Sequence, residues 1–174
     1  MTTWDATHSI AADDLRDLLR GRVVTDPDPR GLRLRAARIR GRLDLDNLAT
    51  TVKLTLLDCL LDEGITAEAA HLPGLSLWRC LVTHTSKTAL SADALRTDAG
   101  VSLKGSTILS ATADGAMRMV GARIGGSLDC SGVTIRNPSG SALDAPGLQV
   151  EGNVFLCGDF TANGAYRPRR STVG

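Results

Sequence analysis

The feature that most constrains this chain is an internal repeat. The stretch from Gly31 to Thr50 aligns without a gap with the stretch from Ala116 to Ile135. The aligned stretches share Arg33/Arg118, Ala37/Ala122, Arg38/Arg123, Ile39/Ile124, Gly41/Gly126, Leu43/Leu128 and Asp44/Asp129. A second alignment pairs ALSADAL, which begins at Ala89, with ALDAPGL, which begins at Ala142. Such repeats indicate a solenoid, whose coils bury their apolar faces only against neighbouring coils.

The spacing of the apolar residues predicts the backbone of each coil. Apolar or small residues at Leu32, Leu34, Ala37 and Ile39 are followed by the same pattern from Leu43 onward. A spacing of two puts side chains on one face of a strand, and a spacing of three requires a bend before the next strand can face inward. The pattern does not follow the helical period. Two such units of about 11 residues close a four-sided coil, so residues 31–164 predict an all-β solenoid, a parallel β-helix of about six coils.

Composition supports a narrow core and limits the partners. Hydrophobic residues make up 43% of the chain but aromatic residues only 3%, so the core must be filled by aliphatic side chains. The 20 basic and 19 acidic residues leave a net charge of +1, which argues against a nucleic-acid partner and against a DNA mimic. We find no signal peptide and no apolar run long enough to span a bilayer. We therefore expect a cytoplasmic protein without membrane insertion.

The chain divides into an N-terminal segment, a repeat domain and a tail. Residues 1–30 are expected to hold a capping helix and a connector, residues 31–164 the β-helix, and residues 165–174 a frayed tail. The capping helix is predicted within Ser9 to Gly21, with Ser9 as the N-cap. Its apolar face would be formed by Ile10, Leu15, Leu18 and Leu19. Extra residues between repeat units predict surface loops at His84 to Lys87, Leu109 to Asp114 and Arg136 to Ser139.

The repeat pattern resembles a known superfamily. A small residue two positions before a central one, as in Ala37 and Ile39, resembles the pentapeptide-repeat superfamily of right-handed quadrilateral β-helices. The central residues Leu34, Ile39, Leu45, Thr50, Leu56 and Leu61 depart from a strict five-residue spacing. The segment GARIGGSLDCSGVTIRNPSGSALDAPGLQVEGNVFLCGDFTANG resembles the repeats of actinobacterial proteins often labelled membrane-associated oxidoreductases or hypothetical proteins. The resemblance covers about Leu32 to Gly164 and implies a right-handed quadrilateral fold without known catalytic residues.

The cysteines and glycines are interpreted as structural. Cys59 and Cys80 share one register and should stack in the core of adjacent coils as free thiols, because a cytoplasmic chain keeps them reduced. Cys130 is expected in the core, whereas Cys157 faces outward and is the one thiol worth testing for reactivity. The glycines Gly121, Gly125 and Gly126 lack the order of a dinucleotide-binding loop and are interpreted as bends. We expect no cofactor, and His71 and His84 have no companion ligands that would form a metal site.

Two regions are candidates for interaction. The first is a set of arginines that could meet phosphates or an acidic partner if the faces align, although pairing with Asp44, Asp46, Asp129 and Asp144 in cross-coil ladders is favoured for such a surface. The set comprises Arg33, Arg35, Arg38, Arg40, Arg42, Arg118 and Arg123. The second is the last coil, where Val154, Phe155, Leu156 and Phe160 would form an uncovered apolar end.

These observations predict a non-catalytic structural or protein-interaction module. It would be a solenoid scaffold that binds an unknown protein partner through its faces or its end, and that forms a homodimer through its C-terminal coils. Two alternatives remain open. A topoisomerase-interacting protein of the pentapeptide type would need a strongly negative long face. A carbohydrate-active or redox enzyme would need clustered carboxylates or a bound cofactor.

Overall fold

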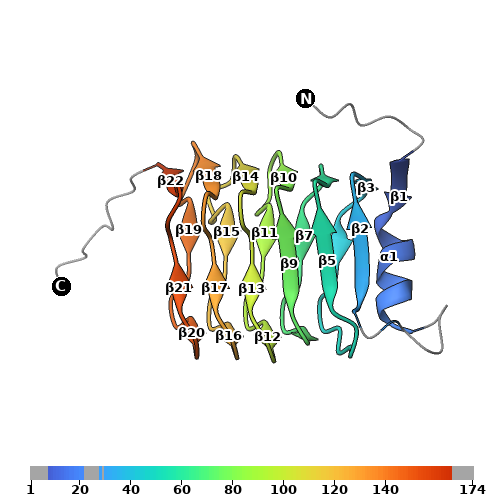
Figure 1. Ribbon diagram of the computed structural model, residues 1–174. Helices are drawn as coiled ribbons and strands as arrows, with labels where there is room; N and C mark the ends of the chain where they lie inside the picture. Colours follow the sequence, from blue (N-terminus) through green and yellow to red (C-terminus); the bar gives the residue numbers. More distant parts are fainter. Residues whose placement is uncertain (1–7, 22–27, 29, 166–174) are drawn as a thin grey trace, which may run out of the picture.

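The computed structural model describes residues 8–21, 28 and 30–165, and shows a stack of parallel strands with one short helix at the N-terminal end (Figure 1). The strands form four sheets of seven, six, five and four strands, one on each side of the coil. Every pair of neighbouring strands is parallel, and each pairing joins one coil to the next. The prediction of an all-β solenoid of about six four-sided coils is confirmed. Of the predicted connector from Thr25 to Gly31, residues 25–27 and 29 lie outside the described residues, as does the predicted tail beyond Ala165.

We number the sheets in the order in which a coil enters them. Sheet I holds β2 (Leu32–Arg35), β5 (Leu54–Leu57), β9 (Leu75–Trp78), β13 (Val101–Ser102), β17 (Leu128–Asp129) and β21 (Val154–Phe155). Sheet II holds β1 (Ser9–Ala11), β3 (Arg38–Arg40), β6 (Leu60–Leu61), β10 (Leu81–His84), β14 (Thr107–Ser110), β18 (Thr134–Asn137) and β22 (Thr161–Gly164). Sheet III holds β4 (Leu43–Asp44), β7 (Ile65–Thr66), β11 (Leu90–Ser91), β15 (Met117–Arg118) and β19 (Leu143–Asp144). Sheet IV holds β8 (His71–Leu72), β12 (Arg96–Thr97), β16 (Arg123–Ile124) and β20 (Gln149–Val150).

The core is a set of rows in which each residue lies on its equivalent in the next coil. In sheet I, Leu54, Leu75, Val101 and Leu128 pair in register and are all buried. Sheet II contributes a row from Ile39 through Val82 and Ile108 to Ile135, which is fully buried. Because each coil touches only its neighbours, the free energy of unfolding is close to a sum of interface terms between coils.

Two corners of the coil require a left-handed backbone at every turn of the solenoid. Between sheets I and II this position is occupied by Ala36, Asp58, Arg79, Gly105, Gly132 and Gly158, and between sheets III and IV by Asn47, Ala69, Ala94, Gly121 and Gly147. All have a φ between 50° and 70°. A residue with a Cβ pays about 1 kcal/mol or more for this conformation. The first three coils bear that cost, and the later coils avoid it with glycine.

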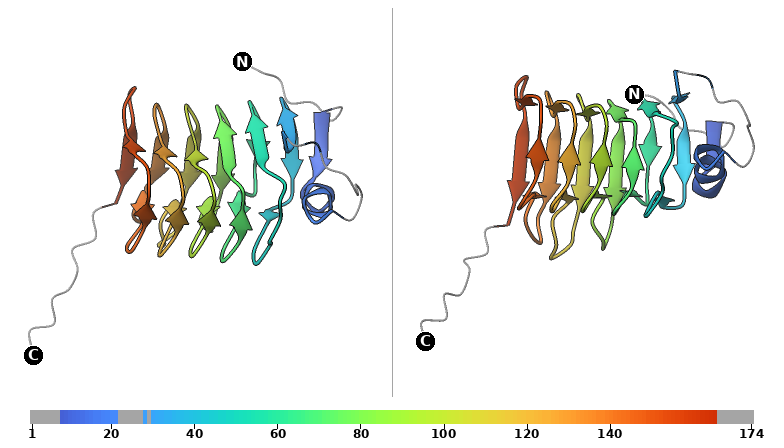
Figure 2. Two further views of the ribbon diagram at one scale, coloured as in Figure 1. Left: turned by 60° about the horizontal axis from the view of Figure 1, so that its bottom comes forward. Right: turned by 90° about the horizontal axis from the view of Figure 1, so that it is seen from below.

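The N-terminal end is closed by helix α1 (Ala12–Leu19), which lies across the first coil (Figure 2). Leu15 and Leu19 are buried against that coil. The hydroxyl of Thr50 donates to the carbonyl of Leu19 at 2.7 Å, and Arg16 pairs with Asp44 at 2.7 Å. These contacts confirm a short capping helix.

The predicted N-cap is wrong. Ser9 lies in β1, which pairs in parallel with β3 and adds a strand to sheet II beyond the first coil. The helix begins three residues later, its N-cap is Ala11, and no side chain caps it. The pairing of Ser9 with Arg38 determines this start, because backbone hydrogen bonds to β3 replace the first helical turn expected from the local sequence.

The loops with extra residues all begin at the ends of sheet II strands, and one row of polar side chains holds them in place by hydrogen bonds. His84, Ser110 and Asn137 occupy equivalent positions at the ends of β10, β14 and β18. His84 Nδ1 accepts from the backbone N–H groups of Ser86 and Lys87, and Ser110 donates to the carbonyl of Lys87. The fully buried Asn137 amide donates to the carbonyls of Thr112, Asp114 and Ser141. The predicted loops are confirmed in part, because each begins one or two residues later than predicted, after the end of its strand at His84, Ser110 or Asn137.

One of the two sequence alignments is shifted by half a coil. The alignment of Ala89 with Ala142 places β11 on β19, and both strands belong to sheet III. The longer alignment places β2 of sheet I on β15 of sheet III, and β3 of sheet II on β16 of sheet IV. All four sides share one inward pattern, so the residues matched in the longer alignment lie on opposite sides of the solenoid.

Candidate functional site

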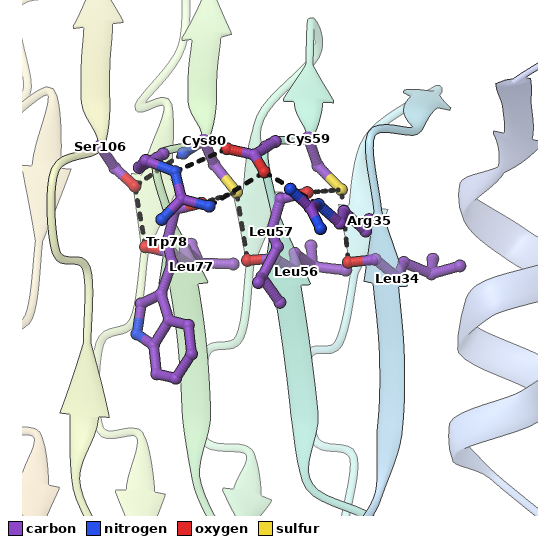
Figure 3. A network of polar contacts seen from close by, with 11 residues as sticks. Leu34, Arg35, Leu56, Leu57, Cys59, Leu77, Trp78, Cys80 and Ser106 are labelled. Carbon is purple, nitrogen blue, oxygen red and sulfur yellow. Dashed lines mark hydrogen bonds and ion pairs between the residues drawn. The ribbon is translucent and has the colours of Figure 1, made fainter.

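The corner between sheets I and II is a continuous polar seam (Figure 3). Cys59, Cys80 and Ser106 follow one another in adjacent coils and point to backbone carbonyls. Cys59 Sγ lies 3.2 Å from the carbonyl oxygen of Leu57, and Cys80 Sγ lies 3.4 Å from that of Leu56. Ser106 Oγ donates to the carbonyl of Leu77 at 2.8 Å and accepts the backbone N–H of Cys80 at 3.0 Å. The seam satisfies backbone groups at a tight bend and is structural.

The environment of the cysteines supports the structural interpretation. Cys59, Cys80 and Cys130 are buried free thiols, and Cys157 is exposed, as predicted. The neighbouring Cys59 and burial raise the pKa of the Cys80 thiol well above its ordinary value. Burial, with the nearby Asp129 charge, raises the pKa of Cys130 to about 12. Reactive cysteines require a lowered pKa and access to solvent, so neither of these two thiols is a nucleophile at neutral pH.

The seven candidate arginines are spread over all four sides of the coil. Arg33 and Arg35 lie in β2 of sheet I, Arg38 and Arg40 in β3 of sheet II, Arg118 in β15 of sheet III and Arg123 in β16 of sheet IV. The structure brings Arg42 and Arg118 together, because both line a hollow of about 520 Å³ with Glu68, Asp93 and Asp114. The faces do not align, so the set forms no continuous basic surface.

Several of these arginines take part in ion pairs between coils. Asp58 pairs with Arg35 at 3.3 Å and with Arg79 at 2.7 Å, and the hydrogen bond from Arg79 lowers the pKa of Asp58. Arg38 pairs with Asp62 at 2.6 Å. Exposed pairs contribute little to stability, roughly 0 to 1 kcal/mol each. These contacts are cross-coil ion pairs of the kind favoured by the sequence analysis, but their carboxylates are Asp58 and Asp62, which the sequence analysis did not name.

Arg118 bridges two carboxylates across three coils. It lies 2.7 Å from Asp93 and 3.3 Å from Asp144, and it is mostly buried between them. Asp44, by contrast, pairs with Arg16 of the capping helix. Asp129 lies in sheet I on the opposite side of the coil and accepts hydrogen bonds from the backbone and hydroxyl of Ser131. Asp44 and Asp129 therefore do not form the carboxylate pair that glycosidic-bond hydrolysis needs.

The histidines are engaged individually. His71 Nε2 lies 2.7 Å from an Asp98 carboxylate oxygen at the surface of sheet IV. Burial, with the charges of Arg42 and Lys87, lowers the pKa of His84. Within the described ranges, no cluster of three or more His, Cys, Asp or Glu side chains is placed to hold a metal ion.

The last coil exposes its apolar residues. Leu143, Val154, Phe155 and Leu156 are 40%, 50%, 43% and 53% exposed. Val154 pairs with the buried Leu128, so the difference in exposure comes from the missing next coil. Phe160 is partly buried against the core. No described element lies over this end, as two further views show (Figure 2).

A second surface feature is a hollow of about 620 Å³ on the outer face of sheet I. It is lined by Trp78, Arg79, Ser102, Lys104, Gly105, Asp129, Ser131, Gly132 and Gly158. The sequence analysis did not single out Trp78 or Lys104. A signal was available, because Trp78 directly follows the core position Leu77, which makes it an outward residue, and because it is the only tryptophan in the repeat region.

Comparisons with protein-family models, with curated proteins and with solved structures find no match to this chain. In the described part of the chain, the single helix is too short and too polar to cross a bilayer. The structure itself therefore defines the class, which is a parallel β-solenoid with one end capped by a helix and one end that no described element covers.

Proposed function

We propose that this chain is a non-catalytic interaction module that associates through its last coil, and that its partner there is a second copy of the chain. The observation that carries the proposal is the exposure of Val154, Phe155 and Leu156 on a coil that no described element covers. An apolar patch on the edge of a sheet is a site for association.

The backbone of the last coil favours the same contact. Strands β21 and β22 each pair with one preceding strand, so one edge of each has no partner among the described strands. Unpaired backbone groups can hydrogen-bond to another strand edge. Two copies that meet end to end would cover both the apolar side chains and the strand edges, and a two-fold axis would place identical patches in contact.

The arginines provide weaker support for an alternative contact. They are divided among the four sides, and several are already paired with carboxylates of neighbouring coils. A partner bound along one face would meet a mixed surface of both signs. We therefore assign the association to the end of the solenoid rather than to a basic face.

Sedimentation velocity over a range from low to high micromolar concentration tests the proposal. We expect a dimer that dissociates on dilution. The double variant Val154→Arg, Leu156→Arg should remain monomeric, because two buried charges would meet across the contact. Thr85→Arg, which adds a charge on the exposed loop after β10 in the third coil, away from the last coil, is the control and should still dimerise. A monomer at tens of micromolar in the unmodified protein would contradict the proposal.

A further inference from the structure

The hollow on sheet I results from a change in side-chain size along two outward rows. In one row Trp78 is followed in the next coils by Lys104 and Ser131. At the adjoining corner Arg79 is followed by Gly105, Gly132 and Gly158, which have no side chains. Trp78 and Lys104 thus border a surface formed by Ser131 and by the glycines of the corner. The result is a concave site with an aromatic border, which is the usual form of a small-ligand site.

The indole of Trp78 is held in place. Its Nε1–H donates to Ser102 Oγ in the next coil at 2.8 Å. Figure 3 shows the ring broadside, extending along the sheet away from the contacts of Cys80 and Ser106. A fixed aromatic ring offers a flat apolar surface at a low cost in conformational entropy. Leu57, which holds the equivalent position in the preceding coil, lies outside the hollow.

Charges of both signs border the hollow. Arg79 is compensated by two hydrogen bonds to Asp58, at 2.7 and 3.0 Å. Lys104 makes no ion pair with any described residue. Asp129 uses Oδ1 to accept from Ser131, which leaves Oδ2 available as an acceptor. An anionic ligand would meet Asp129 and a cationic one would meet Lys104 and Arg79, so the site favours a neutral molecule that can both donate and accept hydrogen bonds.

We propose that this hollow binds a neutral saccharide. A sugar ring has an apolar C–H face, which would pack on the indole of Trp78, and hydroxyl groups at its rim. These hydroxyls would donate to Asp129 and accept from Lys104. The proposed contacts come from the side chains of Trp78, Lys104 and Asp129 in the third to fifth coils, and the hollow extends to Gly158 in the last coil.

Isothermal titration calorimetry with two matched probes tests the proposal. We expect cellotetraose to bind the full chain, and the β-1,4-linked tetramer of glucuronic acid, which carries carboxylates on the same backbone, to bind at least about tenfold more weakly. Trp78→Ala should weaken cellotetraose binding by about tenfold or more, and Leu57→Ala should leave it unchanged. Trp78→Tyr, which keeps an aromatic face, should retain most of the affinity.

A second measurement uses the unmodified chain, so that a folding defect in a Trp78 variant cannot be mistaken for a loss of binding. In the unmodified chain the indole N–H resonance of Trp78, assigned by its loss in Trp78→Tyr, should shift on titration with cellotetraose and not with the β-1,4-linked tetramer of glucuronic acid. The proposal is overturned if cellotetraose neither binds nor shifts this resonance. Tighter binding of the acidic probe, or equal loss in Trp78→Ala and Leu57→Ala, would also overturn it.

Discussion

The first three coils and the last three coils contain the same inward rows of side chains, but they differ in what covers the end of the solenoid and in the residues at the corners. Helix α1 covers the first coil, and its Leu15 and Leu19 are buried. The last coil has no such cover among the described residues, and its Leu156 is 53% exposed. The left-handed corners show the opposite trend, since early coils place Ala, Asn, Asp or Arg there and late coils place glycine. The repeat pattern therefore determines which side chains face inward, whereas the presence of a neighbouring coil or helix determines which of them are buried.

The largest expected effect concerns one row of leucines in sheet I. Leu77 is fully buried, and Leu156 occupies the equivalent position in the last coil. Leu77→Ala should lower the free energy of unfolding by about 3 kcal/mol, because it leaves a cavity between two coils. Leu156→Ala should cost less than about 1 kcal/mol at concentrations where the chain is monomeric. Urea denaturation at low protein concentration measures both, and equal losses would contradict nearest-neighbour burial as the source of stability.

The left-handed corners between sheets III and IV offer a pair of opposite substitutions. Gly121 has a φ of +63°, and a Cβ added there would meet no atom within 4 Å, so Gly121→Ala should cost only the backbone strain, about 1 kcal/mol. Ala94 holds the same position in the preceding coil with a φ of 53°. Ala94→Gly relieves that strain but adds freedom to the unfolded chain, so it should stabilise by about 0.5 kcal/mol or less. Thermal denaturation compares the two, and a loss of stability in both variants would refute the strain argument.

The smallest expected effect is a pH dependence confined to the loop after β10. His84 fastens the loop after β10, and its pKa is lowered chiefly by burial and also by Arg42 and Lys87. The unfolded chain therefore binds a proton more readily than the folded chain. The contribution of neutral His84 is present above about pH 6.5, the ordinary value, and is lost as the pH falls through the lower folded-state pKa.

Amide hydrogen exchange at residues 85–88 and 139–141 checks this pH dependence, with rates expressed as protection factors because intrinsic exchange slows at lower pH. Acidification should lower the protection factors in the first loop, whereas the second loop, held by the non-titrating Asn137, should respond much less. His84→Asn is the control, because it supplies an acceptor that does not titrate in this range. Persistence of the acid effect in that variant would assign it to another group.

Much of the core and of the cysteine chemistry could be predicted from the sequence. The inward positions Leu54, Cys59 and Ile65 follow directly from a spacing of two within strands and three between them. The exposed end at Val154 and Leu156 follows from the loss of the pattern after Gly164. Asn137 could not be recognised in this way, because its five hydrogen bonds join two loops that are distant in sequence.

The sequence by itself determined that the chain forms a four-sided solenoid with an aliphatic core, because the alternation of inward and outward side chains is a local property of the strand. Only the tertiary structure decided which side each outward residue occupies. All four sides repeat one pattern, so a shift of half a coil preserves every inward position while it exchanges opposite faces. Backbone hydrogen bonds between strands one full coil apart, such as Arg96 on Arg123, remove that ambiguity. They separate the candidate arginines, and they place Trp78 beside Ser102 and Lys104 on sheet I.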